Sequence, residues 1–407
     1  MKIGRGVSVA AVACCVAAIA ACGSSTVGSS EPSSSGSNSG PSGSPIKIGL
    51  VGAFSNTPAA QANQPSITSM KAWVSYTNDN GGINGHPVEL FVKDDGHVPS
   101  KALVAVKDLV EHDHVIAIVG IQESGLEDSW ASYAQSAKIP VIGGPANGTA
   151  WLQNPYFFPG GSTAVNTLTN AANSTKVAGK TSYGVVYCAE EPACAQAATY
   201  SKQIAQQLGI PYGGAQALAA SATDYSAQCL KLKNGGANMV FLATDINTST
   251  RFMTSCQKVD YTPSFVDDPR NWLNSQYDNP IWNNQWFFGE GPMWFGDSPA
   301  IKTMQDAMKK YQPGVLQNSN TALGWAAGVM FGDAAKAGIK AGAEPTSAAL
   351  LDGLYSLGPN YTADGLVPPV TFTRGKPATQ KTCGWYAQMV NGKFSSPKGS
   401  DMICIGS

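Results

Sequence analysis

The chain has 407 residues, of which 43% are hydrophobic and 13% are charged, and its formal net charge is −1. This length exceeds what one ordinary hydrophobic core organises, and it predicts a globular protein with two lobes. Because the chain is almost neutral and its Lys and Arg residues are scattered, nothing in its charge favours binding to nucleic acid.

The N-terminal part differs in composition from the rest. Basic residues precede an apolar run over 7–21, which is shorter than the roughly 20 residues of a membrane-spanning helix and predicts a signal peptide over 1–21. The run ends in Ala-Ala-Cys-Gly at Cys22, which resembles a bacterial lipobox and predicts a lipid on this cysteine. A plain secretory signal with an incidental cysteine is the alternative. The Ser-, Gly- and Pro-rich segment over 22–45 predicts a flexible tether, because it has almost no apolar surface to bury.

From residue 46 onward, strand patterns alternate with helical patterns. Short apolar or alternating runs predict strands over 46–51, 88–93, 115–120 and 139–142. Apolar residues at helical spacing predict helices around 67–74, 103–110 and 128–137. This order predicts a doubly wound parallel sheet, a class that binds ligands at the carboxyl ends of its strands.

A second α/β series follows a crossover expected at 157–161. Its predicted strands cover 183–187 and 238–243, and its predicted helices cover 197–208, 224–232 and 250–257. Further crossovers are expected at 287–294 and 365–372, on either side of a small-residue helix over 321–338. Four tryptophans near the second crossover are expected to pack in the core, with an aromatic ligand pocket as the alternative: Trp272, Trp282, Trp286 and Trp294.

Three motifs carry a resemblance to a known family. They are the turn, strand and acid pair of 81–95, the Thr-Asp-Tyr-Ser element of 223–226 and the closing strands around 370–372 and 390–394. Their order and spacing resemble the leucine/isoleucine/valine-binding family, the solute-binding proteins of branched-chain amino acid ABC transporters. The resemblance covers nearly all of 46–398.

The resemblance implies the type I periplasmic binding protein fold, in which two doubly wound α/β lobes are joined by three hinge crossovers. It implies that lobe one consists of 46–160 plus 290–366, and that lobe two consists of 161–289 plus 367–407.

The cysteines predict disulfides. Of the nine cysteines, Cys14, Cys15 and Cys22 belong to the signal and the lipid site, which leaves six in the exported part. An even number in an exported chain indicates disulfides, although many pairings are possible. We favour Cys188–Cys194 across one loop, Cys229–Cys256 between consecutive helices and Cys383–Cys404 across the C-terminal strands. The spacing does not suit a structural zinc site, and no metal or cofactor is expected.

The resemblance also implies ligand-binding residues. Ser124, Ala146 and Asn147 match the lobe-one positions that bind a ligand carboxylate, and a hydroxyl with N–H groups near a helix start suits an anion. In lobe two, Asp245 stands where the family often has a tyrosine, and Asp268 lies near the ammonium-binding position, where a carboxylate makes a charge-assisted bond. The alternatives are helix capping for Ser124 and Asn147, and an exposed acidic turn for Asp268.

These implications predict a monomeric, lipid-anchored extracytoplasmic protein of an ABC importer that is not an enzyme. It would capture a small solute, an amino acid or a related small carboxylate or amide, by hinge closure and deliver it to the permease subunits. The chain has no hydrolase elbow, phosphate loop or zinc-binding helix motif. The alternatives are a ligand-sensing receptor of the same fold that signals to a partner, and a lipid-anchored hydrolase.

Overall fold

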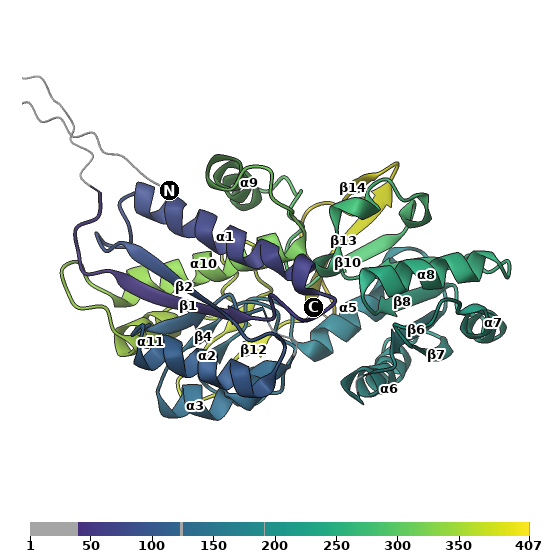
Figure 1. The fold of residues 1–407 in the computed structure, drawn as a ribbon, viewed down its shortest axis with the longest axis horizontal. Coiled ribbons are helices and arrows are strands. Elements are labelled where there is room, and N and C mark those ends of the chain that lie inside the picture. The colour runs from purple at the N-terminus through teal and green to yellow at the C-terminus, as the bar shows by residue number, and fades with distance from the viewer. Residues whose placement is uncertain (1–39, 123–124, 191, 407) are drawn as a thin grey trace, which may run out of the picture. The chain divides into compact units, whose positions relative to one another are not determined.

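Two separate sheets organise the chain (Figure 1). The structure is a computed structural model that describes residues 40–122, 125–190 and 192–406, and the chain from Gly40 onward forms one compact unit. The first sheet has the spatial order β2-β1-β3-β4-β5, and all of its strands are parallel. Its strands are β1 (Ile46–Gly52), β2 (Val88–Asp94), β3 (Ala117–Val119), β4 (Val141–Ile142) and β5 (Phe157–Phe158).

Helices cover the first sheet, and we call this assembly the first lobe. The helices that come between its strands are α1 (Ala60–Asp79), α2 (Pro99–Glu111), η1 (Leu126–Ser129), α3 (Ala131–Ser136) and α4 (Ala150–Gln153). Three helices from later in the chain follow one another: α9 (Pro299–Tyr311), α10 (Ser319–Gly338) and α11 (Ser347–Ser356). Of these, α9 and α10 pack against α1, and α11 packs against α10. The first lobe therefore contains segments that lie far apart in the sequence.

The second sheet repeats the strand order of the first and then extends it. Its parallel part has the order β7-β6-β8-β9-β10, which is the same winding as β2-β1-β3-β4-β5. These strands are β6 (Tyr183–Cys188), β7 (Tyr212–Leu218), β8 (Met239–Ala243), β9 (Ser264–Asp267) and β10 (Trp286–Gly289). Antiparallel strands from the C-terminal part continue the sheet beyond β10: β13 (Cys383–Val390), β14 (Lys393–Ser395) and β15 (Ile403–Cys404).

The second sheet and its helices form the second lobe. Its helices are α5 (Ala164–Val177), α6 (Pro192–Gln207), α7 (Ser226–Asn234) and α8 (Ile246–Gln257). Three short turns of 3₁₀ helix lie between β9 and β10: η2 (Pro269–Asn271), η3 (Asn274–Gln276) and η4 (Pro280–Trp282). A separate ribbon of β11 (Val370–Thr371) and β12 (Thr379–Gln380) precedes β13.

The chain passes between the two lobes three times, and the three passages are hydrogen-bonded to one another. After β5, the amide of Ser162 donates to the carbonyl oxygen of Glu290, which follows β10, at 3.0 Å. The Gln380 side chain, which precedes β13, donates to the Gly161 carbonyl oxygen at 3.0 Å. The predicted architecture of two doubly wound lobes joined by three crossovers is confirmed, and the antiparallel edge of the second sheet is an addition to it.

The packing of α10 against α1 depends on glycine. Asn318 and Thr321 form a capping box that starts α10. A Cβ atom on Gly328 would lie 2.5 Å from Cδ2 of Trp73, and one on Gly332 would lie 3.1 Å from Cζ2 of the same ring. The absence of side chains at these two positions therefore lets the α1 indole lie flat against the backbone of α10.

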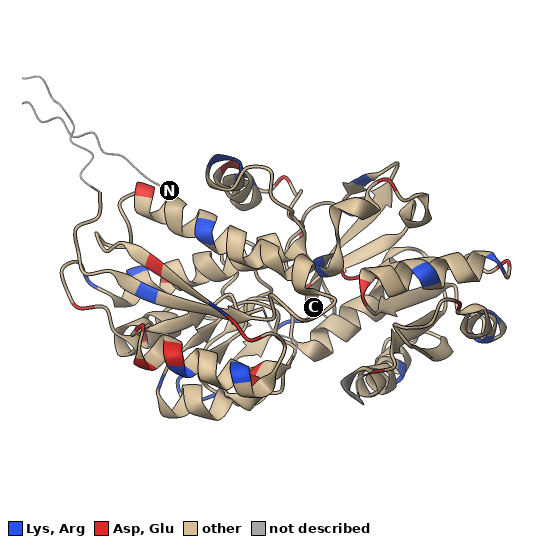
Figure 2. Ribbon diagram, viewed as in Figure 1, with Lys and Arg blue, Asp and Glu red and all other residues tan. Residues whose placement is uncertain are grey.

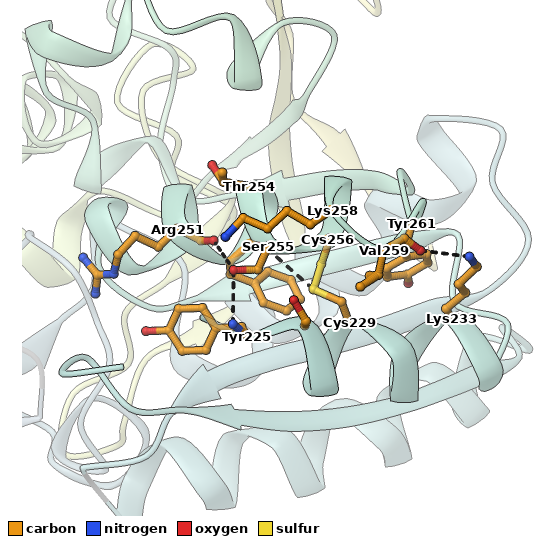
Figure 3. Close-up of a disulfide and its surroundings, with 12 residues drawn as sticks. Tyr225, Cys229, Lys233, Arg251, Thr254, Ser255, Cys256, Lys258, Val259 and Tyr261 are labelled. Carbon is orange, nitrogen blue, oxygen red and sulfur yellow. Dashed lines mark hydrogen bonds between the residues drawn. A yellow bond between two sulfur atoms is a disulfide. The ribbon is translucent and has the colours of Figure 1, made fainter. Parts of the chain in front are cut away.

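Three disulfides brace the second lobe. Cys229 of α7 is bonded to Cys256 of α8, and both residues are fully buried (Figure 3). Close to this disulfide, the Tyr225 amide donates to Ser255 Oγ at 3.1 Å. Cys188–Cys194 ties the end of β6 to α6, and Cys383–Cys404 ties β13 to β15. These are the three pairs that the sequence favours.

The chain enters the first sheet through a fixed turn. Just before β1, the Gly43 amide donates to the Gly85 carbonyl oxygen at 2.9 Å, and Nδ1 of buried His86 lies 2.8 Å from the Ser44 carbonyl oxygen. Nε2 of the same ring lies 3.1 Å from the Lys340 carbonyl oxygen. The segment ahead of β1 is thus held at the amino end of the strand.

Most of the predicted elements are present, with several differences. Strand β7 and the helices α5, α9 and α11 carry no prediction from the sequence. Helix α8 begins at Ile246 instead of residue 250, because the Asp245 side chain caps it. The tryptophans belong to the core: Trp272 and Trp282 are completely buried, and Trp272 packs edge-on against Trp282, Phe287 and Phe394.

Candidate ligand-binding site

The carboxyl ends of three strands of the second sheet carry acids. Asp245 lies just beyond β8, Asp267 ends β9 and precedes Asp268, and Glu290 directly follows β10. Because these strands are parallel, their carboxyl ends meet at one edge of the sheet, where proteins of this architecture bind ligands. Figure 2 shows basic and acidic residues distributed over many elements of the described chain.

Arg270 lies between two of these acids. Its Nε donates to Asp268 Oδ2 at 2.6 Å, and its Nη2 lies 2.9 Å from Glu290 Oε1. The local chain positions this group, because the Asp268 side chain also accepts from the Arg270 amide at 3.0 Å and so caps η2. The Arg270 side chain is 17% exposed, whereas Glu290 is completely buried.

Burial governs the electrostatics of this cluster. It raises the pKa of Asp267 well above the ordinary value, and it raises the pKa of Glu290 to about 7 although Arg270 opposes the shift. For Arg270, burial would lower the pKa, but the negative charges of Asp268 and Glu290 outweigh it and raise the pKa. The guanidinium therefore stays charged.

Two carboxylate oxygens of the cluster, Asp267 Oδ2 and Glu290 Oε2, are buried without a hydrogen-bond partner. Three acids and one guanidinium in so small a space favour a positively charged or N–H-donating group nearby. Among the described residues, no group of three or more His, Cys, Asp or Glu side chains is placed to hold a metal ion.

Two asparagines connect this region to the first lobe. The Asn318 side-chain amide donates to the carbonyl oxygens of Ala62 on α1 and Arg270 on η2, both at 2.9 Å. Asn320 donates to the same two oxygens, at 2.9 and 3.3 Å. All atoms of the two side chains are buried. The arginine cluster thus lies where elements of both lobes meet.

Two of the predicted ligand residues of the first lobe, Ala146 and Asn147, lie beyond β4. Ala146 is buried and its carbonyl oxygen accepts from the Ala164 amide at 3.0 Å. Asn147 is half-buried, and the structure gives its side chain no hydrogen bond to another described residue. Ser124 lies outside the described residues. No hydrogen bond or ion pair between described residues joins Asn147 to the second-lobe acids.

In the second lobe, the two predicted acids differ. Asp245 accepts from the Asn247 and Thr248 amides at 3.0 and 3.1 Å, so its carboxylate caps α8. Asp268 is buried and belongs to the arginine cluster, so it is not an exposed acidic turn. Arg270, Glu290 and the two asparagines were not predicted from the sequence. The available signals were the position of Arg270 two residues after Asp268 and that of Glu290 directly after an aromatic strand.

Two cavities lie in other parts of the second lobe. One of about 260 Å³ is lined by residues between Met253 and Gln285, and one of about 290 Å³ lies between Tyr277 and Gly392. Neither is lined by any of the predicted ligand residues. They therefore do not define the candidate site.

The chain was compared with known families and proteins. A family model described as periplasmic binding protein matches residues 45–393, which include strands of both sheets. The chain belongs to this family. Members of the family bind solutes, and membership implies that this binding protein works outside the cytoplasm. No curated protein matches it. Among the described residues, no helix is long and apolar enough to cross a membrane.

Solved structures share the fold of this binding protein. A possible leucine/isoleucine/valine-binding protein from Rhodopirellula baltica superimposes with a TM-score of 0.72 at 15% identity, over 87% of this chain and 96% of that one. A fatty acid ABC transporter substrate-binding protein from Thermomonospora curvata gives 0.70 at 19% identity, over 89% and 91%. A solute-binding protein of an ABC transporter from R. palustris, in complex with 4-hydroxybenzoate, gives 0.69 at 18% identity, over 88% and 97%. At these identities the likeness establishes the fold and leaves the ligand open.

Proposed function

We propose that this chain is the substrate-binding lipoprotein of an ABC importer, and that it captures a small amino acid or a related small carboxylate or amide between its lobes. The family match over residues 45–393 is the observation that carries this proposal. The three hydrogen-bonded crossovers support a hinge mechanism, in which contacts from a ligand to both lobes stabilise the closed form.

The second lobe would bind the positively charged end of the ligand. The carboxyl ends of β9 and β10 supply Asp267, Asp268 and Glu290 against the single guanidinium of Arg270. The unpartnered oxygens Asp267 Oδ2 and Glu290 Oε2 support an ammonium as the matching group. A cation beside these acids would lower their raised pKa values and form strong charge-assisted bonds. Asp245 is the weaker candidate for a ligand contact, because its oxygens already accept from the start of α8.

The first lobe would bind the carboxylate or amide end through Ser124, Ala146 and Asn147. The Asn147 side chain supports this role, because it is half-buried and makes no hydrogen bond to another described residue. An amide can donate to a carboxylate and accept from an amide, so it suits either ligand class.

The protein would act as a monomer held at the membrane by a lipid on Cys22, with the segment 22–45 as a flexible tether between the membrane and the folded part, which delivers the ligand to the permease subunits. A Cys22→Ala variant expressed in a bacterium that lipidates proteins should be released from the membrane fraction, because one acyl chain already contributes about 0.8 kcal/mol per buried methylene. A variant that stays in the membrane fraction would contradict the anchor.

Thermal unfolding of residues 40–407, which form one compact unit, against a panel of amino acids, amides and small aromatic acids tests the ligand class. A ligand at a hundredfold its dissociation constant adds roughly 2.7 kcal/mol to the free energy of unfolding, so a true ligand raises the melting temperature clearly. We expect the amine-bearing carboxylates or amides to do so. Stabilisation only by acids that lack an amine would refute the ammonium site of the second lobe, and turnover of any compound would refute a pure binding role.

Variants then test the residues. Ser124→Ala and Asn147→Ala should weaken binding of the stabilising ligand and leave the melting temperature of the free protein unchanged. Ser136→Ala is a matched control, because Ser136 is exposed on α3 and its hydroxyl bonds only to the nearby Tyr133 carbonyl oxygen. If both site variants bind as tightly as the control, the first-lobe site is wrong.

A further inference from the structure

Glu127 of η1 connects two segments of the first lobe. Its Oε1 accepts from the Gly148 amide at 2.7 Å and from Nε1 of Trp151 at 2.8 Å. The Glu127 and Trp151 side chains are completely buried, and a Cβ atom on Gly148 would lie 2.7 Å from Oε1, so only glycine fits beside this carboxylate. The loop after β4 is therefore held against η1 by a buried acceptor.

Asp128 continues the same contact with the next two residues of the loop. Its Oδ1 accepts from the Ala150 amide at 2.8 Å. Its Oδ2 accepts from the Thr149 amide at 3.0 Å and from Thr149 Oγ1 at 2.9 Å. Two adjacent acids thus accept from three consecutive backbone amides, those of Gly148, Thr149 and Ala150, which directly follow Asn147.

We propose that Glu127 and Asp128 are positioning residues that hold the loop 146–150 in the one conformation that presents Ala146 and Asn147 to the ligand. This inference rests on the proposed function, which assigns Ala146 and Asn147 to the ligand. Neither acid makes a hydrogen bond to these two residues, so both act through the loop.

The same contacts limit the number of backbone N–H groups that the loop can donate to an anion. The amides of Gly148, Thr149 and Ala150, which precede and begin α4, already donate to carboxylates of the chain. A ligand carboxylate therefore cannot use them without displacing Glu127 or Asp128. Binding in the first lobe therefore has to rely on the residues before Gly148. The N–H groups at the start of α4, which the sequence suggested as anion donors, are excluded from this role.

The two acids respond differently to amide replacement. In Glu127→Gln the side-chain carbonyl oxygen can keep both hydrogen bonds, because one oxygen, Oε1, accepts both of them. In Asp128→Asn one of the two accepting oxygens becomes an NH₂ group, which then faces a backbone N–H. The hydrogen bonds that hold the loop should therefore persist in Glu127→Gln and be lost in part in Asp128→Asn. Glu127→Leu should disrupt them as well.

Amide hydrogen exchange in the otherwise intact chain tests, without a ligand, whether the two acids hold the loop. In Asp128→Asn, exchange at residues 148–150 should rise about tenfold, which corresponds to about 1.4 kcal/mol, while exchange in β1 and β3 stays unchanged. In Glu127→Gln it should stay at the wild-type rate, with the indole N–H resonance of Trp151 unshifted. Asp352→Asn is the control, because Asp352 is exposed and pairs only with exposed Arg374. Unchanged exchange in Asp128→Asn would overturn the inference.

Titration with L-leucine and with the best compound of the panel separates this inference from the proposed site. Weaker binding in Asp128→Asn and Asn147→Ala, together with wild-type binding in Glu127→Gln, supports both the positioning role and the proposed site. Weaker binding in Asn147→Ala alone overturns the positioning role and leaves the site in place. Normal binding in Asn147→Ala overturns the first-lobe site itself, and with it the role of the two acids.

Discussion

Removing the disulfide between α7 and α8 should destabilise this protein more than removing the one beside α6. The Cys229–Cys256 bond closes a loop with a sequence separation of 27, whereas Cys188–Cys194 closes one of only 6. If the bond acts by restricting the unfolded chain, the longer loop contributes about 3.5 kcal/mol and the shorter one about 2 kcal/mol. Because Cys229 and Cys256 are fully buried, the lost packing of two sulfurs adds to the first value.

The assay is urea unfolding followed by tryptophan fluorescence. The double variants Cys229→Ala with Cys256→Ala and Cys188→Ala with Cys194→Ala are compared with the wild type, and their denaturant slopes have to agree for the midpoints to be comparable. We expect the first variant to lose more than 1 kcal/mol beyond the second, as the loop-length difference requires. Equal losses, or a larger loss at Cys188–Cys194, would refute the loop-length reasoning for this chain.

Three further predictions concern the packing and charges described above. Arg270→Leu should lower the free energy of unfolding by about 3–5 kcal/mol, because it leaves Glu290 buried without its cation. Lys258→Leu, in the exposed pair with Asp224, should change it little. Equal effects of the two variants in urea unfolding would contradict a buried ion pair. Because the pKa of Glu290 is about 7 in the folded protein and ordinarily 4.5, the native state binds more protons between these values, so stability falls as pH rises through this window. Glu290→Gln should flatten that slope in melting curves recorded across the window, and an unchanged slope would assign it to other groups. Gly328→Ala should destabilise by about 1–3 kcal/mol through its clash with Trp73, and more than Gly332→Ala, whose new methyl would lie farther from the ring; the reverse order would contradict the packing.

Patterns along the chain predicted the fold well where the local signal agrees with the tertiary structure. The buried apolar run of β3 was recognisable, because a strand covered on both faces is apolar throughout. Strand β7 was not predicted, since its sequence Tyr-Gly-Gly-Ala-Gln-Ala-Leu mixes small and polar residues. It also contains Gly213, where a Cβ atom would lie 2.7 Å from Ala237 in the turn after α7. Helix α5 is rich in Asn, Thr and Ser whose side chains are buried by neighbours distant in sequence, which no local pattern reveals.

The candidate site was less accessible to prediction than the fold. The sequence indicates that Asp268 follows a strand, but its pairing with Arg270 depends on a turn of 3₁₀ helix. The pairing of Arg270 with Glu290 joins residues that follow two adjacent strands, β9 and β10. Asn318 and Asn320 read locally as the start of a helix, and only the tertiary structure shows that they also bond to both lobes. Glu127 and Asp128 resemble ordinary surface acids until the loop after β4 is placed beside them.

The turn that holds Gly43 and Ser44 is the point at which a force on the proposed lipid tether would reach the folded part. It lies just before Ile46, the first residue of β1, and the seven residues of this strand, at about 3.3 Å each, separate it from the carboxyl edge of the first sheet. If the proposed lipid tether joins the fold at this amino edge, it lies away from the carboxyl edge at which the proposed ligand would bind. In the proposed hinge mechanism, the second lobe would then move while the tethered first lobe stays in place.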